Sequence, residues 1–430
     1  MKYHLIDNQL FIKNRAKFTA QMKPNSIAVF NSNDIFTTGA DSTLPFYQHR
    51  DIFYLSGVDQ EESILLLFPN AIDKNHREIL FVKETNDHIA IWEGAKLTKV
   101  QATKTSGVKT VYWLSDFDKV FFDLMTEAET IYFNTNEHYR QAVELESRED
   151  RFIKTVKDKF PAHNWAKSFP ILQSIRGIKE QQELDLLQTA CDITEKGFRR
   201  ILGFVKPGVL EYEIEAEFMH EFLRNRSKGF SYTPIIGSGY NACVLHYIEN
   251  NQQCKDGDML LMDVGAEYAN YSSDMTRTIP VNGRFTDRQK AVYNAVNRVK
   301  EDATKMLIPG TIWAEYHKEV GKLMTSELLG LGLIDKADIQ NEDPNWPAYK
   351  KYFMHGTSHH MGLDTHDYGE LKTPMKANMV FTVEPGIYIP EENMGIRLED
   401  DVVIQENGAP FNLMRNIPIL AEEIEDLMNS

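Results

Sequence analysis

Residues 259–278 read MLLMDVGAEYANYSSDMTRT, two apolar, strand-like runs that each carry an aspartate. The spacing between Asp263 and Asp274 suits neighbouring antiparallel strands joined by a short turn at 267–270. A carboxylate inside a buried strand is costly unless another group compensates its charge. One such residue alone would be read as a structural ion pair or as an outward-facing side chain. The interpretation therefore depends on whether other acidic residues share the pattern.

The C-terminal third of the chain repeats the pattern. Glu384 ends one apolar run. Glu399 lies in the run at 395–403, GIRLEDDVV, where the two-residue period of a strand places Arg397, Glu399 and Asp401 on one face. The histidine-rich stretch HGTSHHMGLDTHD contains His359 and is broken by glycines. We expect this stretch on a loop that leads into a strand.

Four carboxylates and one imidazole form a candidate set of metal ligands. The set is Asp263, Asp274, His359, Glu384 and Glu399. Two divalent cations would neutralise the four negative charges, whereas a single Mg²⁺ or Ca²⁺ would leave the cluster negative. Oxygen donors with one imidazole favour Mn²⁺, with Co²⁺, Fe²⁺ or Zn²⁺ as alternatives. No cysteine lies in these motifs, which excludes a thiolate zinc site.

Helical periodicity organises the region around these residues. A pair of helices precedes a strand-rich stretch, and the same order then recurs, with a Pro-Gly break at 207–208 and again at 309–310. The expected helices span 179–202, 212–225, 287–306 and 313–329, and the strand-rich stretches span 231–280 and 351–405. This order predicts an internal duplication into two αα-then-β halves. Two unrelated α+β stretches would give the same pattern.

The first part of the chain mixes short strands with helices. Strands are expected at 52–55, 63–68 and 78–82, and a helix is expected at 142–159. A break at 167–170 marks the end of this part. The sequence therefore predicts an α/β (α+β) protein with an N-terminal mixed α/β domain, residues 1–172, and a catalytic domain, residues 173–430.

Composition narrows the classes of function. The chain has 430 residues, enough for two domains, and a formal net charge of −16, which disfavours nucleic acid as a partner. Its three cysteines, Cys191, Cys243 and Cys254, form no C-x-x-C pair. The N-terminus does not resemble a signal peptide, and no apolar run is long enough to span a bilayer. We expect a cytoplasmic protein that does not associate with membranes.

The candidate ligands lie within local motifs that resemble those of the pita-bread metallopeptidases. These motifs are Leu245-His246-Tyr247, Asp263-Val264-Gly265, Ser273-Asp274-Met275-Thr276-Arg277-Thr278, His355-Gly356-x-x-His359, Gly362-Leu363-Asp364-x-His366-Asp367, Val383-Glu384-Pro385-Gly386 and Gly395-Ile396-Arg397-Leu398-Glu399. Within that family the chain is most similar to aminopeptidase P of the bacterial two-domain kind. The similarity covers most of the chain and is weakest between about residues 95 and 165. It implies a pita-bread fold for the C-terminal domain.

The resemblance also implies a role for each ligand. Asp263 would bind one metal ion, and Asp274 and Glu399 would bridge two. His359 and Glu384 would complete the coordination of the second ion. A hydroxide that bridges the two metals would attack the scissile carbonyl, and Glu384 would carry the proton.

Further residues match positions around the ligands. By resemblance, His246 and His366 would contact the substrate carbonyl, His355 would line the pocket for the proline, and Tyr388 would form a pocket wall. A single histidine of this kind is more often a structural residue, but the stretch of four histidines around a ligand favours the functional interpretation for His355 and His366. His360 is interpreted as a structural residue.

Two predictions concern charge and assembly. Arg397 lies close in sequence to Glu399 and is expected to hold its carboxylate, with Asp401 as a further partner of Arg397. Trp92 resembles an aromatic residue that reaches the active site of a neighbouring subunit, although a core tryptophan is an equal alternative. The first interpretation implies a homodimer or homotetramer.

The sequence thus predicts a dinuclear metallo-aminopeptidase that releases the N-terminal residue from peptides with proline in the second position. The proline preference rests on the resemblance alone. A dipeptidase for Xaa-Pro, prolidase, would have the same ligands and remains an alternative. A pita-bread binding protein without catalysis is disfavoured because all five ligand types are present.

Overall fold

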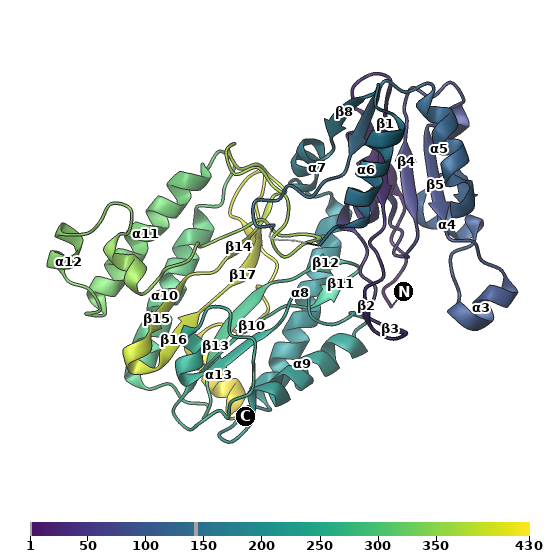
Figure 1. The fold of residues 1–430 in the computed structure, drawn as a ribbon. Coiled ribbons are helices and arrows are strands. Elements are labelled where there is room, and N and C mark those ends of the chain that lie inside the picture. The colour runs from purple at the N-terminus through teal and green to yellow at the C-terminus, as the bar shows by residue number, and fades with distance from the viewer. Residues whose placement is uncertain (1, 142–144) are drawn as a thin grey trace. The chain divides into compact units, whose positions relative to one another are not determined.

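The computed structural model describes residues 2–141 and 145–430. The chain forms two compact units, residues 3–175 and residues 176–430 (Figure 1). Each unit has its own sheets and its own buried core, and they are described separately below. Among the described residues, no helix combines the length and apolar character needed to cross a membrane.

The first unit is a six-stranded sheet in the order β6-β5-β4-β1-β7-β8. The strands are β1 (Ser26–Asn31), β4 (Ile64–Leu67), β5 (Glu78–Val82), β6 (Thr110–Trp113), β7 (Thr130–Phe133) and β8 (Asn164–Lys167). β4 runs antiparallel to both of its neighbours, and the other pairs are parallel. A mixed sheet of this kind, with helices between its parallel strands, confirms the α/β character predicted for the N-terminal part.

Helices cover both faces of this sheet because its strands are apolar on both sides. On one face, α5 (Phe117–Met125) and α6 (Arg148–Lys159) pack on Ile27 and Val29 of β1. On the other face, Phe18 of α1 (Gln9–Thr19) meets Phe30 of β1 with ring centroids 5.3 Å apart. The remaining helices of the unit include α3 (Asp87–Glu93), α4 (Lys99–Ser106) and α7 (Phe169–Arg176).

Local capping explains where the sequence interpretation of this unit was right and where it was wrong. The strands expected at 63–68 and 78–82 are β4 and β5. The strand expected at 52–55 is instead helix α2 (Arg50–Ser56), which begins at the cap His49 and ends at Gly57 in the left-handed conformation, φ 67°. A short apolar run fits either structure, and the caps decide. The helix expected at 142–159 begins at Arg148, and residues 142–144 lie outside the described part.

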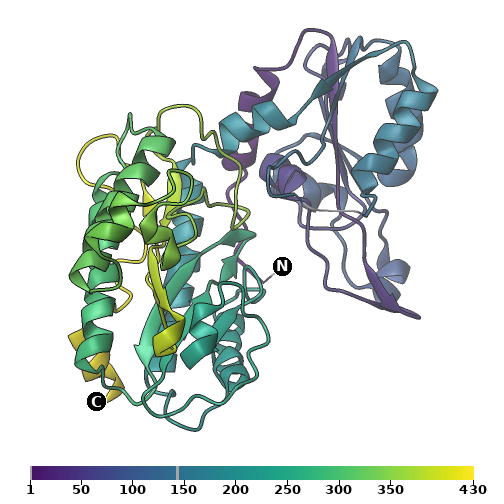
Figure 2. The same cartoon turned by 60° about the vertical axis from the view of Figure 1, so that its left-hand side comes forward.

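The second unit repeats one order of elements, as the sequence predicted. Its first half has α8 (Gln181–Leu202) and α9 (Glu211–Arg224) followed by the sheet of β9 (Ile235–Ser238), β10 (Met259–Val264) and β13 (Met275–Pro280). Its second half has α10 (Asp287–Lys305) and α11 (Trp313–Gly330) followed by β14 (Val380–Val383), β15 (Gly386–Ile389), β16 (Met394–Arg397), β17 (Asp400–Val403) and β18 (Phe411–Asn412). α10 packs on β14, β15 and β16 (Figure 2).

The acidic candidates lie where strands of this unit end. Asp263 is in β10, and Asp274 directly precedes β13, which pairs antiparallel with β10. The hairpin between them turns at Ala269 and Asn270, both with positive φ. The single strand expected over 395–403 is divided: β16 pairs with β15, β17 pairs with β14, and Glu399 lies at the break. Antiparallel pairing of the two aspartate strands is confirmed, whereas the common face expected along 395–403 is not.

Candidate metal centre and active site

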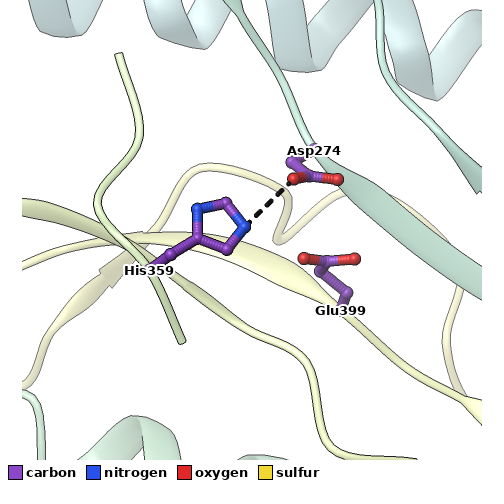
Figure 3. Close-up of side chains that lie close together, drawn as sticks. All are labelled: Asp274, His359 and Glu399. Carbon is purple, nitrogen blue, oxygen red and sulfur yellow. Dashed lines mark ion pairs between the residues drawn. The ribbon is translucent and has the colours of Figure 1, made fainter. Parts of the chain in front are cut away.

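Three of the predicted ligands meet directly inside the second unit. Asp274, His359 and Glu399 each present a ligand atom within 4.8 Å of the other two, and all three residues are buried (Figure 3). The Nε2 atom of His359 is 3.4 Å from Oδ2 of Asp274 and 3.7 Å from Oε1 of Glu384. His359 lies on the loop before β14, as the sequence predicted, and Glu384 lies between β14 and β15.

A tyrosine joins the fifth candidate to this group. The hydroxyl of Tyr232 lies 2.5 Å from Oδ1 of Asp263 and 2.6 Å from Oδ1 of Asp274, so it hydrogen-bonds to both carboxylates. All five predicted ligands therefore belong to one cluster. Sequence reasoning gave no role to Tyr232, because nothing in the local sequence shows that the segment before β9 passes over two aspartates from other strands.

The carboxylates of the cluster are poorly compensated by the surrounding protein. Burial raises the pKa of Asp263 and Glu399, and the neighbouring carboxylates raise both values further. Burial, together with Asp274 and Asp263, raises the pKa of Glu384 to about 7, although His359 and Arg397 oppose the shift. Two buried and two partly buried carboxylates around one guanidinium and one imidazole form a site that fits divalent cations.

The orientation of His359 also fits a metal ligand. Its Nδ1 lies 3.0 Å from the carbonyl oxygen of His360 and donates to it, and its backbone N–H donates to Oγ1 of Thr382 at 3.1 Å. With the proton on Nδ1, the Nε2 lone pair faces the carboxylates of Asp274 and Glu384. Metal-bound histidines are held in this way, with the second ring nitrogen fixed by a carbonyl or carboxylate.

Arg397 contacts a different carboxylate from the one expected. Its Nη2 donates to Oδ2 of Asp263 at 2.6 Å, and its Nε donates to Oγ1 of Thr276 at 3.1 Å. Thr276 in turn donates to Oε2 of Glu399 at 2.6 Å. The prediction that Arg397 holds Glu399 directly was wrong, because the break between β16 and β17 separates the two side chains. Arg397 is hydrogen-bonded to Glu399 through Thr276, and its positive charge acts on that carboxylate directly.

Asp401 is also bonded differently from the prediction. Its Oδ2 accepts hydrogen bonds from the backbone N–H of Asp274 at 3.0 Å and from Sγ of Cys191 at 3.5 Å, and it does not pair with Arg397. Since β17 pairs with β14, Asp401 points toward the end of the aspartate hairpin. It fixes the backbone that carries Asp274.

The remaining predicted histidines lie around the cluster. The ring of His366 packs edge-on against that of His359, with centroids 4.3 Å apart. Nε2 of His355 lies 2.7 Å from the hydroxyl of Tyr388, and Nδ1 lies 3.9 Å from Oε2 of Glu384. Burial lowers the pKa of His355 to about 3, with contributions from the charges of Arg397 and His246, so the ring is neutral. His246 is exposed on the loop after β9.

Tyr388 connects His355 to Arg397. Its hydroxyl accepts a hydrogen bond from Nη1 of Arg397 at 2.8 Å and can therefore donate to Nε2 of His355. Nδ1 of His355 lies 2.7 Å from the carbonyl oxygen of Gly356, which fixes the proton on that nitrogen. Trp92 lies on α3 of the first unit and is 81% exposed, which excludes the alternative that it is a core tryptophan.

Carboxylates and one imidazole meet at the strand ends of the two αα-β halves, and this donor set defines a candidate metal centre. The sequence profile of metallopeptidase family M24 matches residues 185–406, and that of the aminopeptidase P N-terminal domain matches residues 11–132. The chain belongs to metallopeptidase family M24, with an N-terminal domain of the aminopeptidase P type. It is therefore a metal-dependent peptidase, and the resemblance found in the sequence is confirmed.

Similarity to known members extends over both units. The chain is 35% identical to the Xaa-Pro aminopeptidase of Escherichia coli over 98% of each chain, and 32% identical to that of Haemophilus influenzae over 97% of each. Its structure matches zinc-substituted E. coli aminopeptidase P in complex with product, with a TM-score of 0.89, 32% identity and 99% of both chains covered.

Proposed function

We propose that this protein removes the N-terminal residue from peptides whose second residue is proline. The main observation is that all five ligand candidates meet in one buried cluster. The similarity to Xaa-Pro aminopeptidases extends over the whole chain and includes the N-terminal domain of the aminopeptidase P type.

We further propose that the cluster holds two divalent cations, with Mn²⁺ favoured and Co²⁺, Fe²⁺ or Zn²⁺ as alternatives. Asp263 would bind one ion, His359 and Glu384 the other, and Asp274 and Glu399 both. Bound there, the cations would supply Lewis acidity and an acidified water for amide hydrolysis.

Glu384 would move the proton. Its burial among carboxylates favours proton uptake, and its Oε2 lies on the side of His355. Cleavage before proline produces a secondary amine, and that nitrogen carries no proton in the Xaa-Pro bond. Glu384 would take the proton from the attacking water and deliver it to this nitrogen.

The histidines around the cluster would orient the substrate. His366 and His246 would donate hydrogen bonds to the scissile carbonyl and to the charge that develops on its oxygen. The neutral ring of His355 would form the wall that faces the proline ring, and Tyr388, which is fully buried, would hold that ring in place and not line the pocket itself. Arg397 fixes this wall, because it donates to Tyr388.

A substrate panel tests the proposal. With Mn²⁺ added, the purified protein should cleave Ala-Pro-Ala faster than Ala-Pro, and Ala-Ala-Ala much more slowly than either. Chelation, and the Asp274→Asn change, should abolish cleavage and remove bound metal, measured by elemental analysis. Cleavage confined to Ala-Pro would assign a dipeptidase instead, and retained activity in Asp274→Asn would refute the metal assignment.

We also propose a homodimer or homotetramer in the cytoplasm. The exposed Trp92 supports an assembly in which this side chain is covered, and the three free cysteines suit a reducing compartment. Light scattering on the wild-type protein and on Trp92→Ala should show an oligomer that the substitution weakens. A monomeric wild type would refute the assembly.

A further inference from the structure

A second buried charge cluster lies next to the metal site but contributes no ligand to it. We call Arg176, Lys179 and Asp367 the anchor cluster, and all three are almost fully buried. Lys179 donates through Nζ to Oδ2 of Asp367 at 2.8 Å, and Arg176 donates through Nη2 to Oδ1. The backbone N–H of Tyr368 also donates to Oδ1, at 2.8 Å. The carboxylate is thus bonded on both oxygens.

Asp364 balances the charge of the anchor cluster from outside it. Arg176 also donates to Oδ2 of Asp364 at 2.8 Å, and its guanidinium lies 4.0 Å from the centroid of the Tyr368 ring. Lys179 also donates to the carbonyl oxygen of Arg176 at 2.6 Å. Two cations therefore face two carboxylates. Although burial opposes ionisation, Arg176 and Lys179 hold the pKa of Asp367 at about 2, so it stays charged.

Asp367 is connected to the metal ligand through one carbonyl group. Its backbone N–H donates to the oxygen of His360 at 2.9 Å, and the same oxygen accepts Nδ1–H of His359 at 3.0 Å. His366, whose ring packs against that of His359, is the residue directly before Asp367. Any displacement of Asp367 therefore moves both imidazoles.

The loop has little room to adjust. A Cβ atom on Gly362 would lie 2.0 Å from Oδ2 of Asp367, so the backbone passes directly over the carboxylate. The carbonyl oxygen of Gly362 accepts the backbone N–H of Ser272 at 2.8 Å, two residues before Asp274. The anchor cluster thus fixes the loop of residues 360–367 against the aspartate hairpin.

We propose that Asp367, held by Arg176 and Lys179, is a positioning residue that sets His366 and His359 relative to the acidic ligands. The kinetic part of this inference rests on the proposed function. Removing one partner of a buried ion pair leaves an uncompensated charge, so the loop must shift or open when Asp367 loses its negative charge.

A double-mutant cycle separates positioning from general stability. The Asp367→Asn change keeps the shape of the side chain but places an amide group against the donors of Arg176 and Lys179. We expect kcat to fall by about 10- to 100-fold with a smaller change in KM. In a His366→Ala background the same change should cost several-fold less, because one of the two imidazoles that Asp367 positions is gone. Equal losses in both backgrounds would overturn the proposal.

Two further measurements distinguish the possible failures. Hydrogen exchange on the full-length protein should be faster at residues 359–368 in Asp367→Asn than in the wild type. Exchange in β1 and β7 should not change. If exchange at 359–368 is also unchanged, the proposal is overturned whatever the activity. Tyr293→Phe, which removes a buried hydrogen bond to the carbonyl of Ile419 at 2.7 Å, is the stability control and should leave kcat unchanged. A wild type that fails to cleave Ala-Pro-Ala would refute the proposed function, and the exchange result would still test the anchor.

Discussion

At the scale of single residues, the site depends on side chains that hold carboxylates without themselves being ligands. Tyr232 bonds to two aspartates from different segments, and Arg397 bonds to one of them. Burial is the largest cause of the raised pKa of Asp263, and repulsion from the nearby carboxylate of Asp274 raises it further. Tyr232 and Arg397 therefore fix the spacing on which metal binding depends.

We predict that Tyr232→Phe weakens Mn²⁺ binding or lowers kcat/KM by about 10- to 100-fold, the usual effect of losing a group that orients ligands. The hydroxyl is removed while the ring still packs, so the fold should persist. Titration calorimetry with Mn²⁺ and steady-state kinetics measure the two effects. Unchanged values of both would show that the hydroxyl has no part in ordering the aspartates, and Tyr293→Phe again serves as the control.

At the scale of elements, the loop after β9 depends on one buried carboxylate. Glu211, at the start of α9, accepts hydrogen bonds from the N–H and hydroxyl of Ser238 at 2.8 and 2.9 Å, from the hydroxyl of Tyr247 at 2.8 Å and from the N–H of Gln252 at 2.9 Å. These donors lie at both ends and in the middle of the loop that carries His246. One carboxylate therefore closes the whole loop.

Glu211→Gln should displace His246. A glutamine amide directs N–H groups toward donors that previously shared a carboxylate, and each buried group left unpaired costs about 1–3 kcal/mol. We expect a lower midpoint of urea unfolding and a loss in kcat/KM, with bound metal unchanged. Glu213→Gln is the matched control, because Glu213 on the same helix is exposed and caps only Leu210. Equal kinetics for the two variants would contradict the prediction.

Close backbone contact also fixes the position of this loop. A Cβ atom on Gly395 of β16 would lie 2.0 Å from the carbonyl oxygen of Ala242. Gly395→Ala should therefore destabilise the protein by about 1–3 kcal/mol or more, because backbone must move. Gly330→Ala, at the end of α11 with no atom within 4 Å of the added methyl group, should be neutral or slightly stabilising. Urea unfolding compares them, and equal midpoints would refute the steric argument.

At the scale of the whole molecule, buried acids are balanced in different ways. Asp400 in the second unit forms an ion pair with Arg277. The first unit buries Glu149 against Asn31, whose backbone and side-chain N–H groups donate at 2.8 and 3.0 Å. Burial outweighs these bonds and raises the pKa of Glu149 to about 8. The first unit should therefore respond to pH in the opposite direction to an ordinary paired carboxylate.

A raised pKa in the folded state favours the protonated form of Glu149. Its contribution to the free energy of unfolding is complete below the pKa of the unfolded state, about 4.5, and is lost as pH rises through about 8. The free energy of unfolding changes by at most about 1.4 kcal/mol per pH unit over this range. Glu149→Gln should remove this dependence. Hydrogen exchange of β1 and β7 in the full-length protein, corrected for intrinsic rates between pH 5 and 8, measures it. Identical pH dependence in wild type and variant would refute the prediction.

Local patterns in the sequence were sufficient for the donor set and for the repeated order of elements. An acidic residue in an apolar run is recognisable because the cost of burying a charge is high wherever it occurs, so Asp263 and Glu384 could be found without a structure. The periodicity of α8 and α10 is equally local, because one helix face must be apolar to pack. Both signals depend only on neighbouring residues.

Tertiary structure alone decided which groups meet. The role of Tyr232, the partner of Arg397 and the anchor formed by Lys179 with Asp367 each join residues far apart in the chain. The break before Asp400 follows from strand pairing, and the helix at 50–56 follows from its caps. Hydrogen-bond partners depend on strand register and side-chain direction, which packing of the whole unit sets. The sequence by itself therefore determined which chemistry this protein has, and the fold determined how that chemistry is held in place.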